Sequence, residues 1–121
     1  MNPYDKENSE PNYWLSCILI EPEAMCKQIR GEQEAIYIRE NKKSCPTEIL
    51  EQLSKYNIEG RPIWKPMHMQ PVFEGYKYVT VEEGADVGAD IFARGLCLPS
   101  DIKMTEKQQE KVIEIIKGCF L

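Results

Sequence analysis

Asp90-Ile-Phe-Ala-Arg-Gly-Leu-Cys-Leu-Pro-Ser100 is the stretch of this sequence that decides its fold class. The apolar spacing that begins at Val87 predicts a short helix, and Gly95 is expected to end this helix as a left-handed cap. Leu96–Leu98 predicts a short strand, which Pro99 stops because proline cannot donate to a strand ladder. A helix that is followed at once by a strand indicates a fold that mixes both kinds of element.

Two longer helices are predicted on either side of this stretch. Pro46 suits the first turn of a helix, where its missing N–H costs nothing, and Asn57 and Gly60 offer stop signals. Thr105-Glu-Lys-Gln108 has the capping-box pattern of a helix N-terminus. The apolar residues expected to face the core are Ile49, Leu50, Leu53 and Tyr56 in the first helix and Val112, Ile113, Ile116 and Phe120 in the second.

The N-terminal third of the chain carries weaker signals. Residues 1–12 are polar and are interpreted as a flexible segment that precedes a single domain spanning residues 13–121. Tyr13–Ile20 is rich in aromatic and aliphatic residues, so it predicts a strand covered on both faces and central in a sheet. Glu23–Arg39 predicts a helix that is broken near Gly31.

The order of these elements predicts an α/β fold of the two-layer α+β kind, with a short sheet and helices packed mainly on one face. The 121 residues suffice for one domain with one modest core. No apolar run approaches the roughly 20 residues of a membrane helix, and no signal peptide is visible, so the expected location is the cytoplasm.

Composition narrows the possible classes of function. The net charge of −5 argues against a protein that binds nucleic acid by bulk electrostatics, but it allows a local cationic pocket for one phosphorylated small molecule. The five cysteines and single histidine include no CxxC pair, so no metal site is predicted. Cys17 and Cys97 lie in apolar runs, and reduced thiols are the expected state. A disulfide and a reactive thiol are the alternatives.

Arg61-Pro-Ile-Trp-Lys-Pro-Met-His-Met-Gln-Pro71 is the segment that could carry chemistry. Its prolines exclude a helix and pre-order the backbone, which reduces the entropy lost when a ligand binds. Arg61, Lys65 and His68 are potential cations in an otherwise acidic chain. Arginine can bind a phosphate or carboxylate through two N–H groups, and lysine supplies a point charge. Histidine can donate to a phosphate or exchange a proton near neutral pH.

The same segment also permits a purely structural interpretation. Trp64 and Met67 could flank a planar base or a sugar ring, but they could equally cover an edge of the core. Exposed arginine and lysine are common, and a lone histidine is often a structural donor. No set of nucleophile, histidine and carboxylate is legible, and no phosphate-binding glycine loop is present, so no catalytic residue is predicted in this chain.

Four motifs in this order resemble the C-terminal domain of the DegT/DnrJ/EryC1/StrS aminotransferases. They are Asn12-Tyr-Trp-Leu-Ser16, Pro46-Thr-Glu-Ile-Leu50, Arg61–Pro71 and Asp90–Ser100. The resemblance implies the small domain of the aspartate-aminotransferase fold (fold type I of pyridoxal phosphate enzymes), which follows a large cofactor domain. It implies enzymes that use pyridoxal phosphate and an amino-acid amine donor to aminate keto sugars on nucleotide carriers, here a UDP-linked 4-keto sugar. The segment Gly75–Gly88 departs from the family pattern.

The resemblance also assigns roles and partners. The family's Schiff-base lysine lies in the large domain, and Lys65 does not correspond to it, so this chain is expected to be a fragment that is inactive alone and binds no cofactor. Trp64, Lys65, Met67 and His68 would line the entrance for the sugar nucleotide, with His68 the best candidate for substrate contact and Arg61 a weaker one. The expected partners are the large domain and a second copy of the parent enzyme, as a homodimer. The alternatives are a standalone module that binds a nucleotide sugar or a protein, and an inactive fragment with a bare apolar face.

Overall fold

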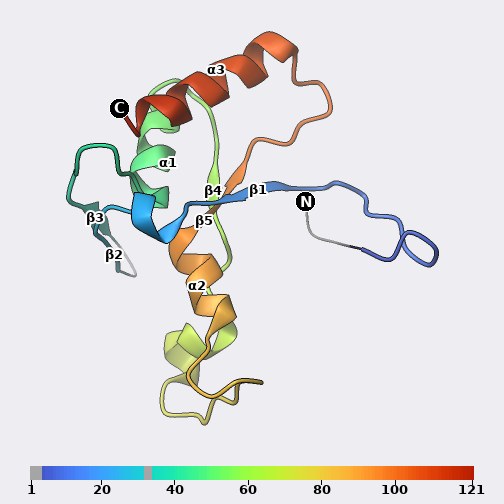
Figure 1. Ribbon diagram of the computed structural model, residues 1–121, viewed down its shortest axis with the longest axis vertical. Helices are drawn as coiled ribbons and strands as arrows, with labels where there is room; N and C mark the ends of the chain where they lie inside the picture. The colour runs from blue at the N-terminus through green and yellow to red at the C-terminus, as the bar shows by residue number, and fades with distance from the viewer. Residues whose placement is uncertain (1–3, 32–33) are drawn as a thin grey trace.

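A three-stranded antiparallel sheet organises the part of the chain that the structure, a computed structural model, describes, which is residues 4–31 and 34–121 (Figure 1). Its strands are β1 (Ser16–Leu19), β4 (Arg61–Pro62) and β5 (Gly95–Leu98). They lie in the order β1-β5-β4, and Cys17 is directly opposite Cys97 on the neighbouring strand. The predicted strand at 96–98 is confirmed, and it is the centre of the sheet.

The prediction that Tyr13–Ile20 forms the central strand is wrong. β1 occupies an edge of the sheet, and most of its residues are exposed, whereas Leu96 of β5 is fully buried. Of the apolar run, Ile20 joins the core, but Trp14 and Leu19 remain 67% and 47% exposed. A continuous apolar run indicates that both faces of a strand favour burial. It does not indicate whether the residues that cover each face belong to this chain.

Two helices cover the sheet and enclose the core with it. α1 (Pro46–Ser54) begins at the predicted proline, and α3 (Glu106–Gly118) begins with the predicted capping box. The Thr105 backbone N–H donates to Gln108 Oε1 at 2.8 Å, and the Gln108 N–H donates to Thr105 Oγ1 at 3.3 Å. The buried core consists of Ile20, Ile49, Leu53, Leu96 and Val112.

The predicted apolar stripes are mostly confirmed. Ile116 and Phe120 of the C-terminal stripe pack against the core together with Val112. Ile113 is 44% exposed, whereas Ile115, which was not predicted to face the core, packs against it. Tyr56, predicted to continue the stripe of α1, lies beyond the end of that helix and is 57% exposed.

The helix predicted over Glu23–Arg39 is also wrong. A short 3-10 turn, η1 (Pro22–Ala24), is followed by β2 (Gln28–Arg30) and β3 (Ala35–Tyr37), which pair as an antiparallel hairpin. Ile29 lies directly opposite Ile36, and both are exposed. Strand alternation places Gln28 and Arg30 on the other face, where their side chains reach distant backbone carbonyls. A helix would scatter these two side chains around its axis.

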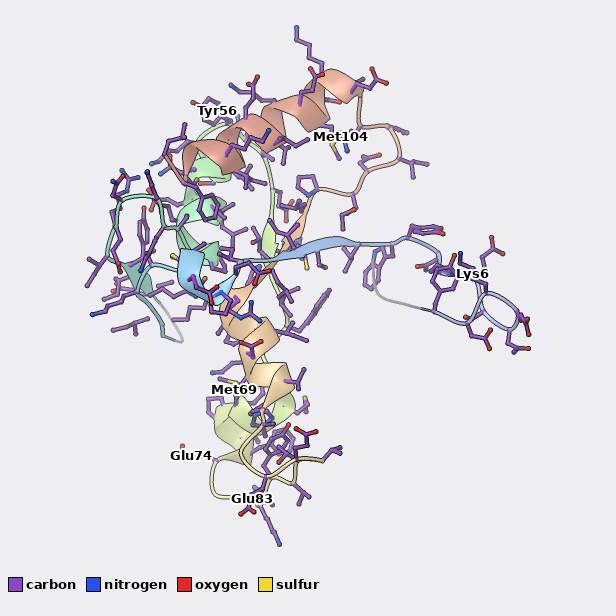
Figure 2. The ribbon with its side chains drawn as sticks, in the orientation of Figure 1. Lys6, Tyr56, Met69, Glu74, Glu83 and Met104 are labelled. Carbon is purple, nitrogen blue, oxygen red and sulfur yellow. The ribbon has the colours of Figure 1, made fainter. Side chains whose placement is uncertain are left out.

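A lobe formed by residues 67–86 lies at the opposite end of the molecule from α3 (Figure 1). It contains two 3-10 turns, η2 (Met67–Met69) and η3 (Pro71–Phe73), and the proline-rich segment Arg61–Pro71 forms no α-helix. Met69, Glu74 and Glu83 mark this lobe in Figure 2, far from Lys6 of the extended N-terminal segment. Helix α2 (Val87–Arg94) connects the lobe to β5.

Gly95, at the junction of α2 and β5, does not adopt the predicted left-handed conformation. Its φ is −100° and its ψ is 152°, which is extended backbone. A Cβ atom at this position would lie 2.5 Å from the carbonyl oxygen of Ile91 and 2.7 Å from the Ile63 side chain. Glycine is therefore required here by close packing and not by a positive φ.

The structure also bears on the expectations about membrane helices, the cysteine thiols and the N-terminal segment. Within the described residues, no helix is both long and apolar enough to cross a membrane. All five cysteines are free thiols, and the sulfurs of Cys17 and Cys97 lie 3.5 Å apart. The flexibility of residues 1–12 stays a prediction, and residues 1–3 lie outside the described part of the chain.

Replacing Leu53 with alanine tests this core. Leu53 is fully buried, so its loss is expected to lower the free energy of unfolding by about 2–5 kcal/mol. Leu121→Ala makes the same chemical change at a residue that is 91% exposed, and it should change stability by less than about 0.5 kcal/mol. Urea denaturation of the two variants measures both values, and equal losses would contradict the core described above.

Candidate functional site

His68 lies in η2, where the surrounding prolines fix the path of the backbone. Its Nε2 is 2.6 Å from Oδ2 of Asp86, which lies 18 positions further along the chain. The His68 side chain is 20% exposed, so part of it still reaches solvent. The predicted substrate contact is thus a partly buried imidazole held by a carboxylate.

The Asp86 carboxylate has several partners. It is the N-cap of α2, and its Oδ1 accepts a hydrogen bond from the Ala89 backbone N–H at 2.9 Å while Oδ2 faces His68. The Ala89 N–H is the main cause that lowers the pKa of Asp86, and His68 and the Tyr78 hydroxyl add to it against the opposing effect of burial. Asp86 is therefore an anion at neutral pH and can only accept hydrogen bonds.

Tyr78 completes the surroundings of His68. The two rings are stacked, with centroids 3.6 Å apart and planes inclined by 13°. Tyr78 comes from the 74–84 loop and covers one face of the imidazole, so this loop and the proline-rich segment form a single unit. Residues 75–88 thus supply both neighbours of His68.

Neither Asp86 nor Tyr78 was found from the sequence as part of a site. An aspartate directly before an apolar helical run is an N-cap signal, so the capping role of Asp86 was within reach. Its pairing with His68 leaves no local signal, because the two residues are brought together by the lobe as a whole. Tyr78 lies in a polar stretch without periodicity and has no local signal either.

The structure does not bring all five predicted residues into one place. Arg61 lies on β4, and its guanidinium pairs with Glu59 Oε1 at 2.6 and 2.9 Å, with both side chains exposed. Trp64 lies against Trp14, with ring centroids 6.2 Å apart. The Lys65 carbonyl oxygen accepts a hydrogen bond from the Gln70 side chain at 3.1 Å.

Met67, next to His68 in η2, is 65% exposed. Whether Trp64, Lys65, Met67 and His68 contact a substrate stays a prediction. Arg61 is separated from these four by its place at a cavity that none of them lines.

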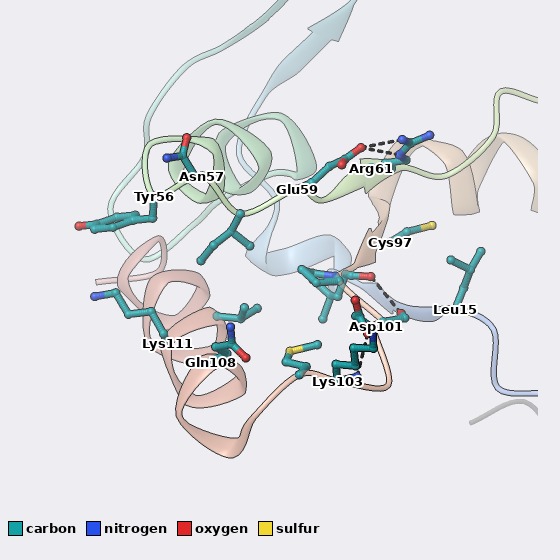
Figure 3. Close-up of a pocket in the computed structure, with 16 residues that line it drawn as sticks. Leu15, Tyr56, Asn57, Glu59, Arg61, Cys97, Asp101, Lys103, Gln108 and Lys111 are labelled. Carbon is teal, nitrogen blue, oxygen red and sulfur yellow. Dashed lines mark hydrogen bonds and ion pairs between the residues drawn. The ribbon is translucent and has the colours of Figure 1, made fainter.

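That cavity, of about 840 Å³, lies between α3, the 99–104 loop and the segment after α1 (Figure 3). Its wall combines apolar residues with groups of both charges. The charged residues of the wall are Glu59, Arg61, Asp101, Lys103 and Lys111. Since the wall carries both charges and Arg61 is already paired with Glu59, the cavity is not a dedicated anion site.

Arg94, a secondary candidate, has a structural position. Its guanidinium binds both carboxylate oxygens of Asp90, at 2.7 and 2.5 Å, and donates to the Ile20 carbonyl oxygen at 2.7 Å. These bonds use the fork of the guanidinium to tie α2 to the end of β1. Among the described residues, no group of three or more His, Cys, Asp or Glu side chains could hold a metal ion.

Comparison with known proteins identifies a family and related proteins. Residues 21–117 match the model of the DegT/DnrJ/EryC1/StrS aminotransferase family. Over 75 residues the chain is 44% identical to a Bacillus subtilis (strain 168) protein named "Putative pyridoxal phosphate-dependent aminotransferase EpsN". This alignment covers 62% of the chain but only 19% of the relative, so the chain spans a small part of the relative's length.

The double role of Asp86 predicts a pH-dependent stability. Because folding lowers the pKa of Asp86, its contribution is fully present above the ordinary aspartate pKa of about 3.9 and is lost as the pH falls through the lowered value. Asp86→Asn should therefore unfold at a lower urea concentration than the wild type at pH 7, and the difference should shrink in acid. Glu83→Gln, an exposed change in the same lobe, is the control. A difference that is constant with pH would contradict the role of the charge.

Proposed function

Because the chain belongs to the DegT/DnrJ/EryC1/StrS aminotransferase family, we propose that it forms the small C-terminal domain of a pyridoxal phosphate-dependent enzyme that aminates a nucleotide-linked keto sugar. A UDP-linked 4-keto sugar is the proposed substrate, and an amino acid is the proposed amine donor. The arrangement of His68, Asp86 and Tyr78 is the observation that supports a substrate role for this part of the chain. It presents one oriented, partly exposed imidazole on a backbone fixed by prolines.

The residues near His68 in the sequence suit a sugar nucleotide. An imidazole can form hydrogen bonds with sugar hydroxyls, and an ammonium such as that of Lys65 can attract a diphosphate. Trp64 and Met67 offer exposed apolar surface against which a ring can lie. We propose that these four residues form one wall of the substrate site, with Arg61 at a greater distance.

The lining of the cavity near α3 does not suit pyridoxal phosphate. The cavity near α3 contains Lys103 and Lys111, but its wall has no glycine that would let backbone N–H groups cradle a phosphate. Asp101 and Glu59 line the same cavity and would repel that phosphate. We propose that the cofactor and the lysine that binds it belong to the large domain of the enzyme, and that these 121 residues alone do not transaminate.

An exposed apolar surface offers a place for that domain. Tyr13, Trp14, Trp64 and Met67 are each between 62% and 67% exposed, and the two tryptophans touch. Large apolar side chains grouped at a surface commonly mark an interface. We propose that this surface contacts the large domain, within an enzyme that is a homodimer.

The second candidate function is a standalone module that binds a nucleotide sugar or a protein. The observation that favours it is the cavity of about 840 Å³, which is large enough for a small ligand. Affinity separates the two candidates. One wall of a larger site should bind with a Kd near 1 mM (about −4 kcal/mol), whereas a complete module should approach 1 μM (about −8 kcal/mol).

His68 is the only histidine of the chain, so its ring signals in an NMR spectrum are assigned without ambiguity. Adding UDP-N-acetylglucosamine at millimolar concentration to the 121-residue chain should shift these signals, and the shifts should not saturate below the millimolar range. Inorganic phosphate at the same concentration is the control and should leave them in place. Unchanged His68 signals would refute the substrate role, and saturation at micromolar sugar nucleotide would favour the standalone module.

A further inference from the structure

The hydrogen bonds of Asp86 determine which nitrogen of His68 carries the proton. Oδ1 of Asp86 accepts from the Ala89 N–H, and Oδ2 lies 2.6 Å from His68 Nε2. An ionised carboxylate has no proton to donate, so Nε2 must be the donor of this bond. The neutral ring is then the tautomer in which Nδ1 has a free lone pair.

The remaining contacts of the ring do not occupy that lone pair. Tyr78 lies parallel to the ring at 3.6 Å and covers a face of it, not its edge. Nδ1 has no hydrogen-bond partner in residues 4–31 and 34–121. Because the His68 side chain is still 20% exposed, a ligand can reach the ring.

We propose that Asp86 is a positioning residue, which holds the His68 Nε2–H toward the start of α2 and thereby presents Nδ1 as an acceptor for a hydroxyl or amino group of the bound sugar. The identity of the ligand rests on the proposed function, but the orientation of the ring does not. This assignment narrows the role of His68, because a neutral Nδ1 accepts a hydrogen bond and cannot donate one to a phosphate.

Two substitutions at Asp86 separate capping of the helix from positioning of the ring. Asp86→Asn has the same shape, and its oxygen can still cap Ala89, but its NH₂ group then faces Nε2 as a donor. It should therefore reverse the tautomer, so that Nδ1 carries the proton. Asp86→Ser also caps a helix, but its side chain is too short to reach His68, so it should leave a mixture of tautomers.

The experiment is long-range ¹H–¹⁵N NMR of the ¹⁵N-labelled 121-residue chain without ligand, at an alkaline pH where the ring is neutral. In the wild type, Nε2 should show the shift of a protonated nitrogen and Nδ1 that of an unprotonated one. In Asp86→Asn the pattern should be reversed, so that Nδ1 shows the shift of a protonated nitrogen and Nε2 that of an unprotonated one. In Asp86→Ser both nitrogens should show intermediate, averaged shifts. A purely structural role for Asp86 would not move these shifts in variants whose backbone spectra show an intact fold.

Averaged shifts in the wild type would overturn the inference, and so would an unchanged tautomer in folded Asp86→Asn. Because this experiment contains no sugar nucleotide, its outcome is independent of the ligand titration. Failure here with sugar binding intact would remove Asp86 as a positioning residue and leave the proposed function standing. If the tautomer shifts behave as expected but the sugar nucleotide does not bind, the ring is oriented by Asp86 and the sugar is not its ligand.

Discussion

The two ends of α2 carry the hydrogen bonds on which the arrangement of this molecule depends. A helix leaves its last carbonyl groups without partners inside the helix. Here the Gln28 side chain donates to the Ala93 carbonyl at 2.6 Å, and Arg30 donates to the Phe92 carbonyl at 2.6 Å. The Ile20 backbone N–H donates to the Arg94 carbonyl oxygen at 3.1 Å. The positive charge of Arg30 also suits this end of the helix dipole.

These bonds set the direction of α2 relative to the sheet, because α2 passes into β5 at Gly95 without a loop. At the other end, Asp86 caps the helix and binds His68 with the same carboxylate. The direction of α2 therefore also sets the position of His68. A change at either end of the helix is expected to move the imidazole as well as to alter stability.

The same bonds explain which parts of this fold could be predicted from the sequence. The capping box at Thr105 and the proline at the start of α1 are local signals, and both helices begin where the sequence predicts. The β2–β3 hairpin was missed because its polar side chains find their partners 62 and 65 positions away. Such partners leave no trace in local periodicity, so the stretch was predicted as a helix broken near Gly31.

The proposed site lies on the part of the molecule that has the least hydrophobic support. η2, η3 and α2 contain no buried residue, whereas the core lies between α1, α3 and the sheet. Prolines and polar bonds hold the lobe, so it should open locally at a lower free energy than the whole domain unfolds. The exposed side chains of Trp64 and Met67 then suggest that a neighbouring domain completes its packing.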